Sequence, residues 1–498
     1  MPELELKKKE LFENMPVFKA VLKLAIPSII GQLILVIYNM TDTFFVGQAS
    51  KIINQSVANE LVAGITICMP LYMILTAISN LFGIGASSVI SRSIGVNNLQ
   101  RARNSARFAF YGCLFVTLVY CLVIFLFENQ ITNFLSGNVA QTAYFAKQYV
   151  FYSIVVFGIP TAINTLFSHI LRAQGKSIHA SFGIALGGIL NCVLDPLFMF
   201  VLYPIEKVAI AAALATGLSN TIALIYYVVL FIIQRKTSIV SIKFSKKAFK
   251  DNIPKEVLKI GLPACLMTLC ENISYMILDN LVGTILISKE ITEQTLKSSS
   301  SALAGIGVAK KLNMLSHSIV RGMSQGVLPL IGYNKSSGNR TRMKKVVYTS
   351  GLISLIISSL CTVVFLIFAK DLSNIFVHEE DAIARSCEFL KILCIGGPFS
   401  AISYTIISFF QAVGKAWKSL ILALLRKGIL DIPLMYIFYF ISVYVLNSPD
   451  PKLIIYATPI ADIVCSIVSL ILFLVYLKYY GQDKEKVCEK EYLLVEKF

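Results

Sequence analysis

The chain has 498 residues, of which 56% are hydrophobic and only 15% are charged, with a formal net charge of +17. Soluble globular proteins carry about 25% charged residues, so this composition excludes an ordinary soluble domain. Apolar runs near the roughly 20 residues that a spanning helix needs recur along the whole sequence. The alternating segments of a membrane strand barrel are absent from the sequence. We therefore expect an all-α polytopic membrane protein.

The excess of basic residues is better explained by membrane topology than by nucleic-acid binding. In a soluble protein it would favour nucleic acid, but here the basic residues gather in particular loops. We therefore expect a lipid bilayer as the surroundings and no nucleic-acid partner. The 11 cysteines include no CxxC pair and the four histidines form no cluster, so neither a disulfide framework nor a zinc site is predicted. The charged start, MPELELKKKE, lacks the apolar core of a cleavable signal peptide.

The apolar segments predict twelve membrane-spanning helices. They lie at about 21–46, 59–86, 105–127, 144–171, 178–202, 208–233, 256–283, 299–326, 346–369, 384–411, 416–441 and 453–477. Lysine and arginine are concentrated in the N-terminal segment, in the tail and in the even-numbered loops, the fourth of which contributes Arg172 and Lys176. Under the positive-inside rule both termini and all even-numbered loops are cytoplasmic, and we expect the protein in the cell (plasma) membrane.

An internal repeat divides these helices into two six-helix lobes. LKLAIP at 22–27 reappears as LKIGLP at 258–263, an offset of 263 − 27 = 236, and the Gly-Lys pair at 175–176 reappears at 414–415. Two halves of the same orientation predict a parallel repeat about an axis along the membrane normal. The predicted segments are a cytoplasmic N-terminal segment at 1–20, an N-lobe at 21–233, a cytoplasmic linker at 234–255, a C-lobe at 256–477 and a cytoplasmic tail at 478–498.

The most informative segment is GGILNCVLDPLFM at 187–199, which sets Asp195 inside an apolar helix. Asn191 lies four residues earlier, so the two side chains share one helix face. Pro196 follows directly and loosens the local backbone. Because a charge at this depth costs roughly 2.5–3.5 kcal/mol, it is read as functional by default. The segment therefore predicts a cation site.

Four stretches in order carry a resemblance to a known family. They are Pro27, Gln32, Asp42 and Gly47 in the first helix, GIGASSVISRSIG at 83–95, RAQGK at 172–176 and NCVLDP at 191–196. With these residues on a twelve-helix topology, the chain resembles the multidrug and toxin extrusion (MATE) family over essentially its whole length. The resemblance implies cation-coupled export, with Asp42, Asn191, Asp195 and a helix-six threonine, matched here to Thr216, as the cation site.

Depth along the helices is consistent with one site. At 1.5 Å per residue, Asp42 lies about 7 Å, Asp195 about 12 Å and Thr216 about 13 Å from the outer helix ends. Two other interpretations stay open: Asp42 is merely interfacial and reaches water, or Asn191 and Asp195 hold helices together.

Further polar residues are candidates for a substrate or second cation site. Tyr38 and Asn39 flank the face of Asp42, and packing is the simpler role for Tyr38. Glu271 lies midway along the seventh helix and is a candidate for substrate or a second cation. Lys427 and Asp431, spaced i and i+4, predict an internal ion pair, and Arg426 beside them is read as structural.

These features together predict a secondary active antiporter, not an enzyme. It would export amphipathic, often cationic organic compounds, such as drugs and toxins, in exchange for Na+ or H+ by alternating access. We expect a monomer with no cofactor besides the coupling ion. The alternative is a flippase of a lipid-linked saccharide or cell-wall precursor from the same superfamily. The basic residues Arg426 and Lys427 are the reason to retain this alternative. The sequence leaves the coupling ion and the substrate range undecided.

Overall fold

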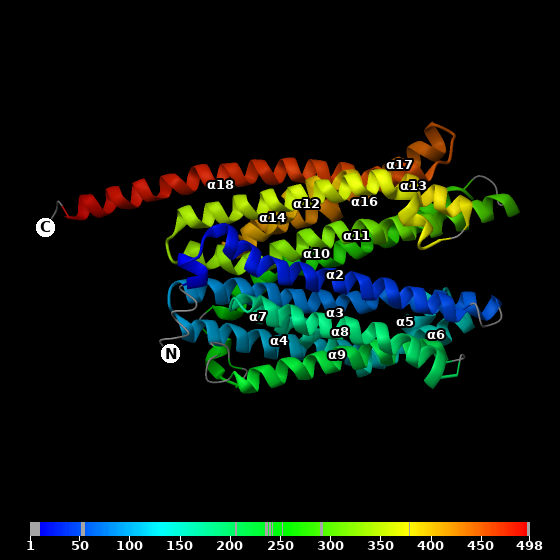
Figure 1. Ribbon diagram of the computed structural model, residues 1–498, viewed down its shortest axis with the longest axis horizontal. Coiled ribbons are helices and arrows are strands. Elements are labelled where there is room, and N and C mark those ends of the chain that lie inside the picture. The colour runs from blue at the N-terminus through cyan, green and yellow to red at the C-terminus, as the bar shows by residue number, and fades with distance from the viewer. Residues whose placement is uncertain are drawn as a thin grey trace.

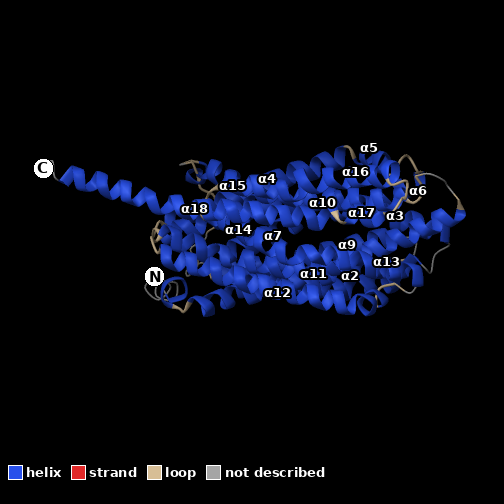
Figure 2. Ribbon diagram, turned by 90° about the horizontal axis from the view of Figure 1, so that it is seen from above, coloured by secondary structure: helices blue, strands red, loops and turns tan. Residues whose placement is uncertain are grey.

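The computed structural model describes residues 10–50, 55–204, 207–234, 238, 241, 243–250, 252–288, 292–377 and 379–495, and every regular element in this part is helical (Figures 1 and 2). The first half contains η1 (Glu10–Asn14), α2 (Val17–Ser50), α3 (Gln55–Gly95), α4 (Leu99–Leu126), α5 (Glu128–Leu135), α6 (Ala140–Val150), η2 (Phe151–Val156), α7 (Gly158–Ala173), α8 (Ser177–Leu197), η3 (Phe198–Leu202) and α9 (Val208–Ile233). The short η5 (Lys246–Phe249) follows. The second half contains α10 (Ile253–Ile285), α11 (Glu293–Ser336), α12 (Arg340–Asn374), α13 (Glu380–Leu393), η6 (Cys394–Gly396), α14 (Gly397–Ala412), α15 (Ala416–Leu424), η7 (Leu425–Leu430), α16 (Asp431–Phe440), η8 (Ile441–Val445), α17 (Pro451–Ile455) and α18 (Ala457–Val495).

The prediction of twelve spanning helices is confirmed. Among the described residues, ten helical segments are long and apolar enough to cross a bilayer, and Ala140–Val156 with Gly158–Ala173, bent by 52°, makes an eleventh. The twelfth is α11, which has 44 residues and carries Lys310, Lys311 and Arg321 within its length. Two of these charges are paired, Lys310 with Asp279 and Arg321 with Glu271, which lowers the cost of carrying them across a membrane.

The helices form two lobes that lie side by side. Figure 1 shows α2 to α9 in one half of the molecule and α10 to α18 in the other. Along the seam, α2 packs against α11 and α3 packs against α10. Parts of the predicted linker at 234–255 and of the two terminal segments fall outside the described residues, so this division of the chain stays a prediction.

The lobes touch most closely at the end of the bundle that carries η1, which we name the proximal end. A Cβ atom on Gly261 of α10 would lie 1.7 Å from the Leu81 carbonyl oxygen of α3, and one on Gly85 would lie 2.2 Å from the Val257 carbonyl oxygen. Backbone therefore meets backbone across the seam, and only glycine permits this approach. The proximal end of the seam is closed.

The η1 segment adds a second closure at the proximal end. Phe12 is 1% exposed, and its ring stacks on Tyr333 of the C-lobe with centroids 4.8 Å apart. Its carbonyl oxygen accepts hydrogen bonds from Asn334 Nδ2 at 3.2 Å and Arg342 Nε at 2.8 Å. The edge of the ring, at Cζ and Cε2, lies close to Gly175, in the α7–α8 turn of the N-lobe. Phe12 is thus wedged between the two lobes.

An ion-pair cluster also crosses the seam at this end. Glu256 of α10 accepts from Arg92 Nη1 of α3 at 3.0 Å and pairs with Arg101 of α4. Ser88 of α3 donates to the Gln411 carbonyl oxygen of α14 at 2.6 Å. These groups belong to opposite lobes, so the contacts are lost if the proximal end opens.

Candidate functional site

The polar groups predicted on the fifth and sixth spanning helices meet inside the N-lobe. Asn191 Nδ2 of α8 donates to Asp195 Oδ1 at 3.1 Å and to Thr216 Oγ1 of α9 at 3.1 Å. Asp195 is fully buried, and Asn191 and Thr216 are also buried. Pro196 lacks a backbone N–H, and a π-helical turn, η3, begins two residues later at Phe198. The proline thus loosens the helix just beyond the acid.

Asp42 is brought to the same place by the packing of α2 on α8. A Cβ on Gly188 would lie 2.7 Å from Ile34 and 3.2 Å from the Tyr38 ring, so the two helices are very close here. Both run away from the proximal end, and one further turn places Asp42 beside Asn191. The carboxylates of Asp42 and Asp195 are close enough for their charges to interact. The structure therefore brings together the acids of two helices.

The helix that carries Asp42 continues beyond the predicted span at 21–46. The helix α2 does not end near Gly47 but continues to Ser50, so Asp42 lies 50 − 42 = 8 residues, or about 12 Å, from its end. Thr216 lies 216 − 208 = 8 residues, again about 12 Å, from the start of α9 at Val208. With Asp42 buried at 7% exposure, the interfacial interpretation of this residue is not favoured.

Three oxygen atoms of this cluster have no hydrogen-bond partner among the described residues. They are Asp42 Oδ1, Asn191 Oδ1 and Asp195 Oδ2. A buried polar atom left without a partner costs roughly 1–3 kcal/mol, and more for a charged group. Oxygen atoms of carboxylates and amides are the ligands that hard cations take. The cluster is therefore chemically suited to hold Na+ or a carboxyl-bound proton.

A cavity of about 830 Å³ lies directly beside this cluster. Tyr38, Asn191 and Thr216 form part of its wall, together with amide and hydroxyl side chains of α2, α3, α7 and α9. Arg321 and Gln325 of α11 also line it, so the cavity reaches the seam between the lobes. Asn39, by contrast, is exposed and is not part of the wall. Of the two residues that flank Asp42, only Tyr38 therefore faces the cavity.

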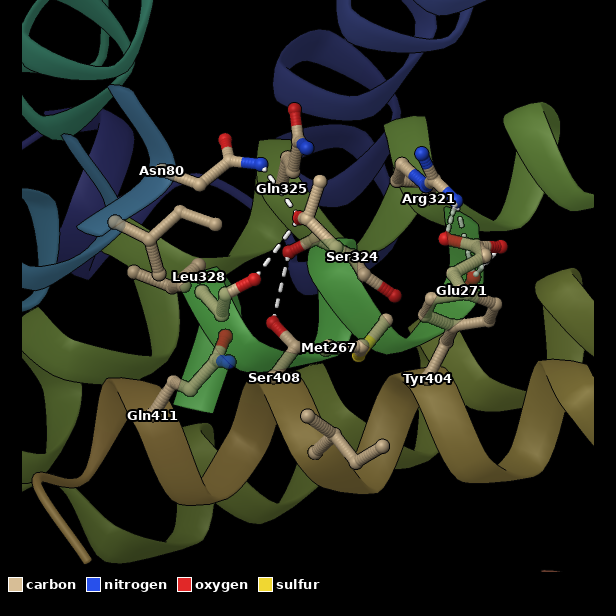
Figure 3. Close-up of a pocket in the computed structure, with 14 residues that line it drawn as sticks. Asn80, Met267, Glu271, Arg321, Ser324, Gln325, Leu328, Tyr404, Ser408 and Gln411 are labelled. Atoms are coloured by element: carbon tan, nitrogen blue, oxygen red, sulfur yellow. Dashed lines mark hydrogen bonds and ion pairs between the residues drawn. The ribbon is translucent and has the colours of Figure 1, made fainter. Parts of the chain in front are cut away.

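A second pocket, of about 520 Å³, shares Asn80, Arg321 and Gln325 with this cavity and extends into the C-lobe. Figure 3 shows Glu271 in this pocket beside Arg321 and Tyr404. Arg321 Nη2 donates to Glu271 Oε2 at 2.7 Å, and the Tyr404 hydroxyl donates to Glu271 Oε1 at 3.2 Å. Glu271 therefore lines a pocket, as a residue that binds substrate or a second cation must. Its charge, however, is already balanced by an arginine.

Arg426, Lys427 and Asp431 of the C-lobe are held in buried ion pairs. Lys427 Nζ donates to Asp431 Oδ2 at 2.8 Å, which confirms the predicted i, i+4 ion pair. Arg426 Nε donates to Asp462 Oδ1 at 2.7 Å, deep inside the lobe. Because these pairs are internally neutralised and fully buried, they do not make a basic lining for an anionic head group.

Two arginines that face the cavities were not proposed from the sequence. Arg321 falls within the predicted helix 299–326, and a lone charge in the middle of such a helix was the signal that could have identified it. The sequence predicts Arg172 in the fourth loop. That assignment is wrong, because α7 continues to Ala173 and Arg172 is 1% exposed. Because Arg172 is so close to the loop in sequence, its position gives no sign that the side chain faces inward.

The MatE family model matches residues 27–197 and again residues 263–437. Each match covers one lobe, and the two starts are the repeated prolines Pro27 and Pro263. The chain belongs to the MatE family. The double match also confirms that the two lobes of this MatE chain are copies of one unit.

Curated relatives and solved structures agree with this assignment. The chain is 26% identical to the multidrug export protein MepA of Staphylococcus haemolyticus (strain JCSC1435), over 93% of this chain and 94% of that protein. It is 24% identical to MepA of Staphylococcus saprophyticus, over 96% and 98%. A structure described as the outward-facing conformation of a multidrug resistance MATE family transporter superposes with a TM-score of 0.80 at 22% identity, covering 96% and 99%. This MatE chain is a multi-pass membrane transporter of the multidrug efflux type, and the flippase alternative is not favoured.

Proposed function

We propose that this transporter is a secondary antiporter that exports amphipathic organic compounds, organic cations among them, in exchange for Na+ or H+. The observation that carries the proposal is the set of three buried, unpartnered oxygens on Asp42, Asn191 and Asp195. Asn191 lies in the wall of the 830 Å³ cavity, and Asp195 is hydrogen-bonded to it from behind that wall.

Coupling follows from the shared wall of the ion cluster and the cavity. A cation held by oxygens of α2 and α8 would draw those helices together, and Asn191 and Thr216 belong both to the cluster and to the cavity wall. Ion binding and cargo binding would therefore favour different shapes of one cavity. Such a difference in affinity between two states is what allows an ion gradient to drive export.

The orientation proposed from the loop charges places the proximal end in the cytoplasm, with both termini on that side. The proximal end is the closed end of the seam in this structure, so the lobes are arranged for release to the outside. Inward opening would then require the Gly261, Phe12 and Glu256 contacts to break. We propose that a single chain performs this cycle, because one chain supplies both lobes and the seam between them.

The test is efflux of a fluorescent cationic dye from proteoliposomes, with Na+ and pH gradients imposed separately. One of the two gradients should drive efflux by the wild type, and Asp195→Asn should abolish it while the protein stays folded in the membrane. Asp279→Asn is the matched control, because Asp279 is a partly exposed carboxylate paired with Lys310. The function is refuted if neither gradient drives efflux. The ion site is refuted if Asp195→Asn transports at the wild-type rate.

A further inference from the structure

Arg172 is a buried cation without a counter-charge among the described residues. Arg172, Arg426 and Lys427 are the arginine and lysine side chains that are fully buried in that part of the chain. Arg426 pairs with Asp462 and Lys427 pairs with Asp431. Arg172 forms no ion pair there: its Nη1 donates to Ser168 Oγ at 3.3 Å and to Gln325 Oε1 at 3.2 Å, both neutral groups.

The other edge of the Arg172 guanidinium, formed by Nε and Nη2, is the part available to a ligand. Nε and Nη2 have no hydrogen-bond partner among the described residues. These two nitrogens form one side of the planar guanidinium, whose parallel N–H groups match the two oxygens of a carboxylate. A buried cation without a partner is strongly unfavourable, so an anionic group placed against this edge would bind well.

The surroundings of Arg172 favour an anion as well. Arg172 lines the 830 Å³ cavity, whose lining residues include no aspartate or glutamate, and the other lining arginine, Arg321, is already paired with Glu271 of the neighbouring pocket. Asp42 and Asp195 lie behind the wall, outside the lining. Gln32, Asn164 and Asn220 supply neutral amide groups, and Tyr38 and Tyr72 supply aromatic surface.

We propose that Arg172 is the anchor for a carboxylate on the exported compound, an inference that rests on the proposed export function. The preferred cargo is then an amphipathic molecule that carries a carboxylate, either an organic acid or a zwitterion, with its aromatic body against Tyr38 and Tyr72. Because Arg172 is bonded to Gln325 of α11, a carboxylate on Arg172 also alters a hydrogen bond between the two lobes.

The test compares two dyes that differ only in this group: a rhodamine carrying a free carboxylate and its methyl ester. Binding to purified protein in phosphatidylcholine nanodiscs is measured without any ion gradient. Wild type should bind the carboxylate more tightly than the ester. Arg172→Gln should weaken carboxylate binding by about ten- to a hundredfold, the loss expected for hydrogen bonds to a charged group, and leave ester binding unchanged. Arg107→Gln, in α4 and outside both pocket linings, is the control and should change neither.

Each result bears on the proposal by itself. Equal wild-type affinity for the two dyes overturns it, and this measurement does not depend on whether Arg172→Gln folds. Equal weakening of both dyes by Arg172→Gln overturns it too, since that pattern indicates a structural role. Gradient-driven efflux of the same dyes is scored separately. A carboxylate preference in binding without efflux would refute the antiporter function and leave the carboxylate site standing.

Discussion

Replacing Gly261 by alanine should force the lobes apart at the proximal end. The new Cβ would lie 1.7 Å from the Leu81 carbonyl oxygen, whereas carbon and carbonyl oxygen in close contact are about 3.3 Å apart. The two backbones must therefore separate by roughly 3.3 − 1.7 = 1.6 Å. Both partners are main chain, so no rotamer change relieves the clash.

The expected cost follows from overpacking. Inserting a methyl group into a packed contact costs about 1–3 kcal/mol, and here the cost falls only on conformations in which α3 and α10 touch. The equilibrium between closed and open proximal ends should therefore shift by about 5- to 150-fold towards the open state. The same factor should appear in local opening measured by hydrogen–deuterium exchange, because exchange follows the population of the open form.

Exchange should be measured for peptides covering 81–95 and 253–264 in wild type, Gly261→Ala and Gly307→Ala. Gly307 is the matched control: it lies in α11 of the same lobe, and a Cβ there would meet nothing within 4 Å. Both changes gain the same helix propensity of alanine. Gly261→Ala should exchange faster in both peptides, and Gly307→Ala should not. Wild-type exchange in Gly261→Ala would show that this contact does not hold the lobes closed.

Three further predictions address the wedge, the ion site and the topology. Phe12→Ala removes a fully buried ring, a loss of about 3–5 kcal/mol, and should likewise speed hydrogen exchange at the proximal end of α11. Unchanged exchange would mean that Phe12 does not hold the proximal end closed. Asp42→Asn and Asp195→Asn should be non-additive in Na+ or proton affinity by more than about 0.5 kcal/mol, because they damage one site; additive effects would indicate two sites. A cysteine at Lys246, which is exposed in η5, should react with an impermeant maleimide only after cells are permeabilised, and labelling of intact cells would reverse the orientation.

The helices and the repeat were predictable because their signals are local in the sequence. A run of about 20 apolar residues marks a spanning helix wherever it occurs, and the Lys427–Asp431 pair follows from helical spacing alone. Asn191 and Asp195 could be placed on one face for the same reason. Their contact with Thr216 was reached by matching a family pattern, and their relation to Asp42 depends on how closely Gly188 lets α2 approach α8.

The two arginines show where such reasoning ends. A carboxylate in an apolar run is conspicuous, since nothing but function or pairing explains it. An arginine at a helix end has an ordinary explanation in membrane topology, which is why the sequence predicts Arg172 as a loop charge. Its side chain turns into the bundle, where it donates to Gln325, which lies 153 positions away in the other lobe. The inward position of Arg172 in the cavity therefore includes a contact between the two lobes. No local pattern in the sequence of either lobe predicts such a contact.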